Sequence, residues 1–195
     1  MNKKVIYGIN GPVVTVKETE GFSMQEMAEA TGRSLADYAA QESGEKDLSF
    51  TFLSKCAAQF GVDVVQLLTG EDPHLTGYSL VRAGDGLPIN RREGFTYLHK
   101  APFFKSRLCE PFLVTTPYSE EEQNKPIHLS HHAGQEFDYI ISGHMRFQYE
   151  DHVEELGPGD TLLYDSGRGH GMIATGGEPC TFIALVMKPG DADIK

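Results

Sequence analysis

The spacing of apolar residues changes once along the chain, near residue 75. Between residues 21 and 70, apolar side chains recur at the period of an amphipathic helix. The residues that follow this period are Met24, Met27, Ala28, Leu53, Ala57 and Phe60. Short breaks at 31–33, 43–45 and 60–62 divide the region into several helices.

The first of these helices is expected to begin after Ser23. Glu26 follows Ser23 at the spacing of a capping box, in which each residue caps the other's backbone N–H. The stretch TGEDPHLTG that follows the helices has the composition of a linker. We therefore expect a helical domain over residues 1–72, with its core at 21–70, and a linker over residues 73–77.

Beyond the linker the pattern is that of short strands separated by turns. The predicted strands are 78–83, 94–100, 111–116, 136–142, 144–150, 161–165, 171–175 and 180–187. Glycine-rich and proline-rich turns such as GDG, GPGD and GG separate them. Many short strands at this spacing indicate a β-sandwich or barrel, here over residues 78–190. The predicted fold class is α+β and multidomain, with an all-α bundle followed by an all-β barrel.

Charge and composition limit the functions open to this chain. Its net charge is −11, and residues 1–72 hold six basic side chains against eleven acidic ones. Because lysine and arginine supply most non-specific affinity for DNA, the helical domain is expected to have little non-specific affinity. No stretch approaches the roughly 18 apolar residues of a membrane span, and the N-terminus lacks a secretory signal. The three scattered cysteines indicate a reducing compartment, so we expect a cytoplasmic protein with no membrane partner.

The helical region contains a two-helix pattern. The strings MQEMAEATGRS, YAAQESGEKDLSFTFLSKCAAQFGV and DVVQLLTG resemble the XRE-type, lambda-repressor-like helix-turn-helix domain. The resemblance implies that a helix over about residues 34–41 enters the major groove of DNA. The side chains that it implies face DNA are Arg33, Ser34, Asp37, Tyr38 and Gln41. The acidic charge leaves an alternative open, a bundle kept for packing or dimerisation.

Six of the eight histidines lie between residues 128 and 170, in two motifs. The first is HLSHHAGQEFDYIISG, and the second is GPGD followed after ten residues by His170. Residues of equal parity on a strand face one side, so Ser130, His132 and Glu136 are expected to point inward together. With His170 from another strand, two imidazoles and one carboxylate form a triad suited to Fe(II), Mn(II), Ni(II) or Zn(II).

These two motifs resemble those of the cupin fold, a double-stranded β-helix or jelly-roll barrel, over about residues 77–190. The metal ligands that the motifs predict are His132, Glu136 and His170. Cupins with a full metal site have histidine at the position of Ser130, so one ligand is missing here. His128 shares the inward parity, whereas His131 is expected to face outward. The alternative is a metal-free polar cluster that binds an anionic or hydroxylated ligand.

Basic residues beside aromatic ones are further candidates for a ligand pocket. Arg92 precedes Tyr97, and Arg107 follows Phe104 in the sequence. A guanidinium group binds a carboxylate through two hydrogen bonds, so we expect a small carboxylate ligand. The predicted ligand contacts are Arg92, Tyr97, Arg107 and Ser130, with exposed strand-edge charges as the alternative. The histidines expected on the surface are His74, His99, His144 and His152.

A helix-turn-helix domain followed by a cupin barrel resembles bacterial one-component transcription regulators. The resemblance implies a homodimer, joined mainly through the barrel, that binds promoter DNA of its own or neighbouring genes. It also implies a small effector in the barrel and no enzymatic activity. One alternative is a metal-dependent cupin enzyme, such as an oxygenase, isomerase or decarboxylase, in which the helical domain only dimerises. A scaffold that uses both folds structurally is the third.

Overall fold

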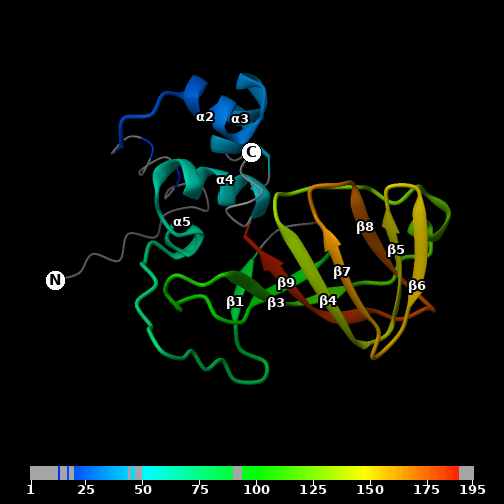
Figure 1. Cartoon of the computed structure of the whole chain (residues 1–195). Coiled ribbons are helices and arrows are strands. Elements are labelled where there is room, and N and C mark those ends of the chain that lie inside the picture. The colour runs from blue at the N-terminus through cyan, green and yellow to red at the C-terminus, as the bar shows by residue number, and fades with distance from the viewer. Residues whose placement is uncertain are drawn as a thin grey trace. The chain divides into compact units, whose positions relative to one another are not determined.

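A computed structural model describes residues 13, 17, 20–43, 45–46, 50–89 and 94–188 of the chain. The chain divides into two compact units, which we call the helical unit and the barrel unit (Figure 1). The helical unit lies within Met1–Tyr78 and includes Phe103–Lys105, and the barrel unit lies within Ser79–Pro102 and Ser106–Lys195. No helix among the described residues is long and apolar enough to cross a bilayer.

Four helices form the described part of the helical unit. They are α2 (Met24–Thr31), α3 (Leu35–Glu42), α4 (Phe50–Phe60) and α5 (Val64–Thr69). The predicted capping box is confirmed, because the Ser23 hydroxyl accepts from the Glu26 N–H and the Glu26 carboxylate accepts from the Ser23 N–H. Gly32 ends α2 with a φ of +66°, a left-handed conformation that turns the chain into α3.

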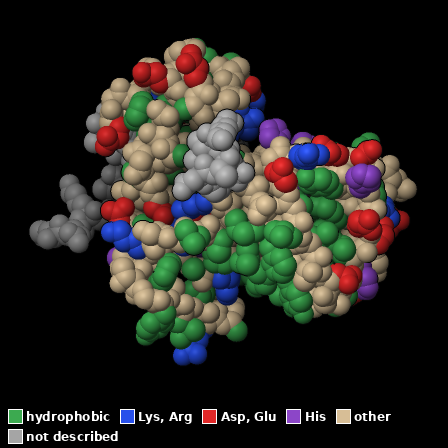
Figure 2. Space-filling model, in the orientation of Figure 1, with side chains coloured by type: hydrophobic (Ala, Val, Ile, Leu, Met, Phe, Trp, Pro, Cys, Tyr) green, Lys and Arg blue, Asp and Glu red, His purple; other side chains and the backbone are tan. Residues whose placement is uncertain are grey.

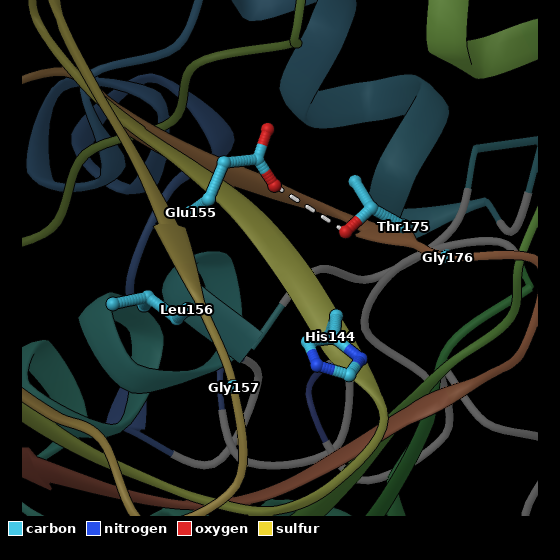
Figure 3. Close-up of a pocket in the computed structure, with 6 residues that line it drawn as sticks. All are labelled: His144, Glu155, Leu156, Gly157, Thr175 and Gly176. Carbon is cyan, nitrogen blue, oxygen red and sulfur yellow. Dashed lines mark hydrogen bonds between the residues drawn. The ribbon is translucent and has the colours of Figure 1, made fainter.

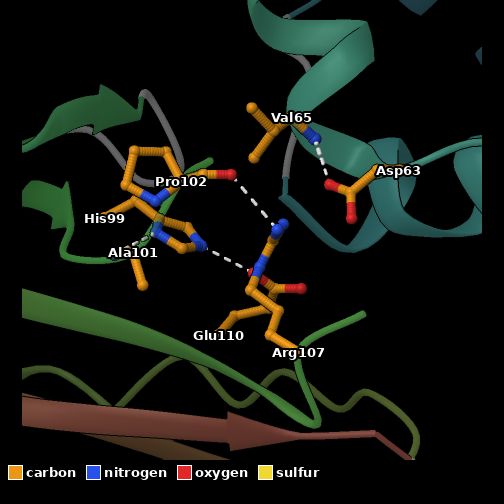
Figure 4. Close-up of polar contacts among 7 residues, drawn as sticks. All are labelled: Asp63, Val65, His99, Ala101, Pro102, Arg107 and Glu110. Carbon is orange, nitrogen blue, oxygen red and sulfur yellow. Dashed lines mark hydrogen bonds and ion pairs between the residues drawn. The ribbon is translucent and has the colours of Figure 1, made fainter. Parts of the chain in front are cut away.

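The core of the helical unit is apolar and closely packed. Its fully buried side chains are Met27, Tyr38, Phe52, Leu53, Cys56, Val65 and Leu67. The Tyr38 ring lies 5.6 Å from that of Phe52, and burial raises the pKa of the Tyr38 phenol, so it stays protonated at neutral pH. Asp63 caps α5 by accepting a hydrogen bond from the Val65 N–H at 2.9 Å (Figure 4).

Two side chains that were expected to face DNA are buried instead. Tyr38 has no exposed surface and Gln41 is 6% exposed, so the prediction for both residues was wrong. A helix of eight residues must bury one stripe at i, i+3 and i+4, and Tyr38, Gln41 and Glu42 form that stripe of α3. Arg33 and Ser34 are exposed just before the helix.

The exposed start of α3 carries small or apolar side chains. Leu35 is 48% exposed, and Ala36 is also exposed. The Ser34 hydroxyl accepts from the Asp37 N–H at 3.1 Å and caps the helix. The Lys46 ammonium lies 2.6 Å from Asp37 and holds the pKa of that carboxyl below its usual range. The start of α3 therefore offers backbone N–H groups rather than long polar side chains.

Two antiparallel sheets form the barrel unit (Figure 1). The larger has the order β1-β2-β3-β9-β4-β7, and the smaller has the order β6-β5-β8. The strands of the larger sheet are β1 (Leu87–Ile89), β2 (Thr96–His99), β3 (Cys109–Thr116), β4 (Gln135–Ser142), β7 (Thr161–Asp165) and β9 (Cys180–Met187). Those of the smaller sheet are β5 (His144–Tyr149), β6 (His152–Leu156) and β8 (His170–Thr175). This two-sheet arrangement confirms the predicted all-β barrel.

The strand predictions differ from the structure in three places. The predicted strand at 78–83 was wrong: Tyr78 is 81% and Leu80 62% exposed, so this segment buries little apolar surface. The sequence analysis also missed β1 and β6. Most of β6 is exposed, and it lacks the alternation that marks a half-buried strand; its pairing with β5 forms it.

The barrel core lies between the two sheets. Side chains alternate along β3 and β9 between buried and half-buried positions, as expected for strands with one face inward. The buried apolar residues of the core include Phe112, Val114, Ile140, Met145, Phe147 and Phe182.

The glycine that closes the first motif sits where no other side chain fits. Gly143, between β4 and β5, has a φ of +74°. A Cβ atom there would lie 2.2 Å from the carbonyl oxygen of Pro179 and 2.8 Å from the Cα of Cys180. Both contacts are with backbone, which cannot move aside as a flexible side chain can.

We expect Gly143→Ala to lower the free energy of unfolding by more than about 2 kcal/mol, since left-handed strain adds to a backbone collision. Gly177→Ala is the matched control, because Gly177 has a φ of +85° with nothing within 4 Å of a Cβ. In this control the substitution adds only the left-handed strain, so the free energy of unfolding should fall by about 1 kcal/mol. Urea denaturation of both variants measures the difference, and equal losses would contradict the collision.

Candidate metal centre

His132, Glu136 and His170 come together within the barrel unit. Their ligand atoms all lie within 4.8 Å of one another, and the residues are 9%, 4% and 3% exposed. The His132 Nε2 lies 2.8 Å from the Glu136 Oε2. The two imidazole rings are 5.1 Å apart and nearly perpendicular. We call these three residues the triad.

Backbone pairing places the triad. Ser130 and His170 exchange two backbone hydrogen bonds of 2.8 and 2.9 Å, which hold the segment before β4 beside the start of β8. The His132 N–H donates to the carbonyl of Ser166 at 2.8 Å, just beyond the end of β7. Glu136 faces inward from β4, in register with Tyr164 of β7. Three separate segments thus supply the three side chains.

A carbonyl group sets the tautomer of His170. The His170 Nδ1 lies 2.9 Å from the carbonyl oxygen of Arg168. Because a carbonyl only accepts hydrogen bonds, Nδ1 carries the proton and Nε2 is the nitrogen that would bind a metal. A histidine that donates its other nitrogen in this way is typical of metal centres.

The sequence analysis missed two residues beside the triad. The Tyr164 ring lies 5.0 Å from that of His170, and its hydroxyl lies 3.4 Å from the Asp138 carboxylate, which is fully buried. Asp138 shares the parity of Glu136 on β4, so the sequence held a signal for it. Tyr164 gave none, because its ring on β7 of the larger sheet meets the ring of His170 on β8 of the smaller sheet only in the folded barrel. Burial, with the charge of Asp138, raises the pKa of the Cys180 thiol to about 11, so it supplies no thiolate at neutral pH.

The residues of the triad fit one divalent transition metal. Metal–nitrogen and metal–oxygen bonds are about 2.0–2.2 Å long, so ligands on adjacent positions lie about 3 Å apart. The His132 Nε2 and the Glu136 Oε2, which share a hydrogen bond of 2.8 Å, are close to that spacing, and all three ligand atoms lie within 4.8 Å of one another. Two imidazoles and one carboxylate leave coordination positions open, as in non-haem iron sites, and they also suit manganese, nickel or zinc.

The other polar residues of the first motif lie outside this cluster. Ser130 is exposed, and its backbone, not its side chain, gives the contact with His170 described above. His131 is exposed, as expected. His128 is exposed as well, so the expected inward direction of Ser130 and His128 was wrong: β4 begins at Gln135, and the parity of a regular strand does not extend back to them.

Two of the predicted pocket residues, Tyr97 and Arg107, are buried. Arg92 lies outside the described residues. Tyr97 is 7% exposed, with its ring stacked on Phe95 and at right angles to Phe112. Arg107 is 5% exposed and pairs with a carboxylate of its own chain, that of Glu110.

Arg107 belongs to a buried ion-pair network (Figure 4). Its Nε donates to Glu110 at 2.5 Å, and its Nη1 donates to the carbonyl of Pro102 at 3.1 Å. The His99 Nδ1 accepts from the Ala101 N–H at 3.0 Å, so the Nε2 proton points to Glu110, 2.6 Å away. His99 is fully buried, and its predicted surface position was wrong: β2 turns it inward, where Glu110 meets its hydrogen-bonding need. His74, His144 and His152 are exposed, as expected.

A groove of about 560 Å³ lies on the smaller sheet (Figure 3). It is lined by His144, Glu155, Leu156, Gly157, Thr175 and Gly176, with no member of the triad. Its carboxylate is already paired, because Arg146 donates to Glu155 at 2.6 Å and the Thr175 hydroxyl lies 3.4 Å away. The groove lacks a convergent set of ligand atoms, so the triad is the stronger candidate site.

Comparison with known proteins agrees with this geometry. Residues 118–187 match the model of the cupin domain family, and this stretch contains the whole triad. The match covers about a third of the chain, and the two antiparallel sheets of the barrel unit agree with a cupin fold. No curated protein sequence matches the chain.

Solved structures extend the similarity of fold to nearly the whole chain. An HTH_3 family transcriptional regulator from Vibrio cholerae aligns with a TM-score of 0.64 and 21% identity, over 93% of this chain and 96% of that one. The Fe(II) form of HppE aligns at 0.50 and 18%, over 92% and 98%. Hydroxypropylphosphonic acid epoxidase from S. wedmorenis aligns at 0.46 and 19%, over 92% and 96%. The chain thus combines a helix-turn-helix fold with a cupin fold.

The buried ion pair of Arg107 and Glu110 leads to a prediction about the stability of the fold. Arg107→Ala should lower the free energy of unfolding by about 3–5 kcal/mol, because Glu110 then stays buried without its cation. Arg168→Ala is the control: its side chain is 59% exposed and pairs with Glu150 at 3.3 Å. Loss of that surface pair should cost at most about 1 kcal/mol. Urea denaturation measures the loss in the free energy of unfolding for both variants. Similar losses would contradict the claim that burial makes the pair of Arg107 and Glu110 matter more than the exposed pair.

Proposed function

We propose that the protein is a transcription regulator whose cupin domain binds a divalent transition metal and a small effector at that metal. The observation that carries this proposal is the convergence of His132, Glu136 and His170 within 4.8 Å inside a cupin domain. The similarity in fold to a transcriptional regulator over 93% of the chain supports the regulatory role.

The triad supplies the chemistry of effector binding. A bound metal would act as a Lewis acid that holds a carboxylate or hydroxyl oxygen at its open positions. Glu136 contributes negative charge, while the Arg168 carbonyl and the Tyr164 ring orient His170. Because Arg107 is paired with Glu110, we assign recognition of an effector carboxylate to the metal rather than to this guanidinium.

Binding to promoter DNA is the second part of the proposal. The pair α2 and α3 would place the N-terminus of α3 on the DNA, where backbone N–H groups bind phosphates and Arg33 adds a positive charge. A homodimer would present two such helices to half-sites about one helical turn apart. The acidic charge of the chain implies weak non-specific affinity, so specific contacts must dominate.

A metal-dependent cupin enzyme is the second candidate. The open coordination positions of the triad favour it, because a substrate and a co-substrate need such positions. So does the exposed start of α3, where Leu35 and Ala36 offer no amide or guanidinium group to read base edges. The similarity in fold to the Fe(II) form of HppE is consistent with this role. The helical unit would then serve packing or dimerisation.

Metal binding tests the first part of the proposal. Titration calorimetry with Mn(II), Ni(II) or Zn(II), and with Fe(II) without oxygen, should show one ion per chain. His132→Ala and Glu136→Gln should each weaken binding at least about 100-fold, because each removes one ligand atom of the triad. His131→Ala is the matched control, since this neighbouring histidine is exposed. Unchanged affinity in both triad variants would refute the site.

DNA binding tests the second part. Fluorescence anisotropy with DNA from upstream of the gene, at two salt concentrations, should show specific binding that weakens as salt rises. Ala36→Glu should abolish it, because a carboxylate at the start of α3 repels phosphate. Ala58→Glu, the same change at an exposed position of α4, should not. A metal-loaded protein that binds no DNA at low salt but converts a small substrate would favour the enzyme.

A further inference from the structure

The outer face of the larger sheet is apolar, although the core lies on the opposite face. Cross-strand pairing arranges its side chains in two rows. One row is Leu98, Leu113, Ile183 and Tyr139, and the other is Pro111, Leu185, Phe137 and Leu163. Ile141 of β4 adds to them. We call these nine residues the apolar sheet face.

The apolar sheet face is open to solvent. Tyr139 is 43%, Ile141 45% and Leu163 63% exposed, and the other six members are half-buried. Figure 2 shows apolar side chains gathered over this part of the barrel, in the region of β9, β4 and β7 in Figure 1. Single exposed apolar residues are ordinary on protein surfaces, but a contiguous sheet face of large side chains is typical of an interface.

The border of the apolar sheet face is almost uncharged. On one side lie Thr96, Thr115, Thr181 and Ser142, and on the other Cys109, Met187, Gln135 and Asp165. Among these outward positions of the paired strands, all of which the structure describes, Asp165 alone carries a charge, and it lies on the edge strand β7. Charged residues make up 23% of the whole chain, so this face departs clearly from the average.

The lack of charged residues on the apolar sheet face indicates which kind of partner covers it. Each chain carries a net charge of −11, so two copies repel each other wherever acidic surfaces meet. An uncharged face lets two acidic chains approach without burying unpaired carboxylates. A nucleic acid or an acidic partner would instead require lysine and arginine, and none of the nine residues is basic. Lys100 lies beside Pro111 at the edge, but its ammonium donates to the carbonyls of Arg82 and Asp85.

We infer that a second copy of this chain covers the apolar sheet face, so that a dimer forms by packing of the two larger sheets. A two-fold axis places the same patch on both partners, which suits an apolar surface without charge pairing. Nine large side chains present an area on the order of several hundred Å², comparable with the roughly 800 Å² per partner of a standard interface. The triads face the barrel interiors and stay outside this contact.

This inference supplies the interface of the proposed homodimer, but its test needs neither metal nor DNA. Light scattering after size exclusion should give the full chain twice its 21.5 kDa mass at micromolar concentration. Leu163→Lys and Ile141→Lys should each weaken dimerisation at least about 100-fold, because each buries a lysine in the interface. Val153→Lys is the matched control, since Val153 is 52% exposed on β6 of the smaller sheet.

Circular dichroism melts check that each variant folds, and Tyr139→Ser is a milder change at the same face should a lysine prevent folding. A monomeric wild-type chain would overturn the inference, and would leave a segment of the same chain or another protein to cover the face. A wild-type dimer that persists in Leu163→Lys, Ile141→Lys and Tyr139→Ser would place the interface elsewhere. Loss of the dimer in Val153→Lys as well would also refute the assignment.

Discussion

The backbone hydrogen bonds between Ser130 and His170 are the contact on which the candidate site depends. They join the segment before β4 to the start of β8, which belongs to the other sheet. Together with the bond from the His132 N–H to Ser166, they hold His132, which precedes β4 of the larger sheet, beside His170 of the smaller sheet. Gly171 makes this closeness possible, because a Cβ there would lie 2.3 Å from the carbonyl oxygen of His128. The backbone pairing thus determines where the side chains of the triad lie relative to one another.

The sequence predicted those parts of the site that depend on local rules. Strand parity pointed His132 and Glu136 to one side, and the spacing of the second motif added His170. The same parity wrongly turned Ser130 and His128 inward, because β4 begins only at Gln135. The sequence analysis missed the contact of Tyr164 with His170, which depends on how the two sheets pack against each other. It also misplaced Arg107 and His99, because a buried charge is decided by its partner, here Glu110. Glu110 faces His99 across the β2–β3 hairpin, whereas it lies only three residues beyond Arg107, so only the contact with His99 depends on strand pairing.

In the helical unit, too, the features that follow local rules were predicted correctly, and the packing was not. The period of apolar residues, the capping box and the Gly32 turn gave the helices correctly. The resemblance to a known domain did not say which face of α3 is buried, and Tyr38 and Gln41 were placed outward. Packing against α2 and α4 settles that face, since Tyr38 contacts Phe52. Once Tyr38 is inside, Ala36 lies outside, whereas Leu35 shares the face of Tyr38 but is 48% exposed as the first residue of the helix. The chemistry open to α3 changes with this burial.

Charge connects the two proposed binding events in the barrel. An anionic effector needs a cation, and among the described residues of the barrel unit the one buried guanidinium, that of Arg107, already neutralises Glu110. Glu136 and Asp138 bring further carboxylates to the same interior. A divalent metal on the triad would therefore first offset carboxylate charge and then attract the effector's oxygens. Effector affinity and metal occupancy are linked in this scheme, so each strengthens the other by the same free energy.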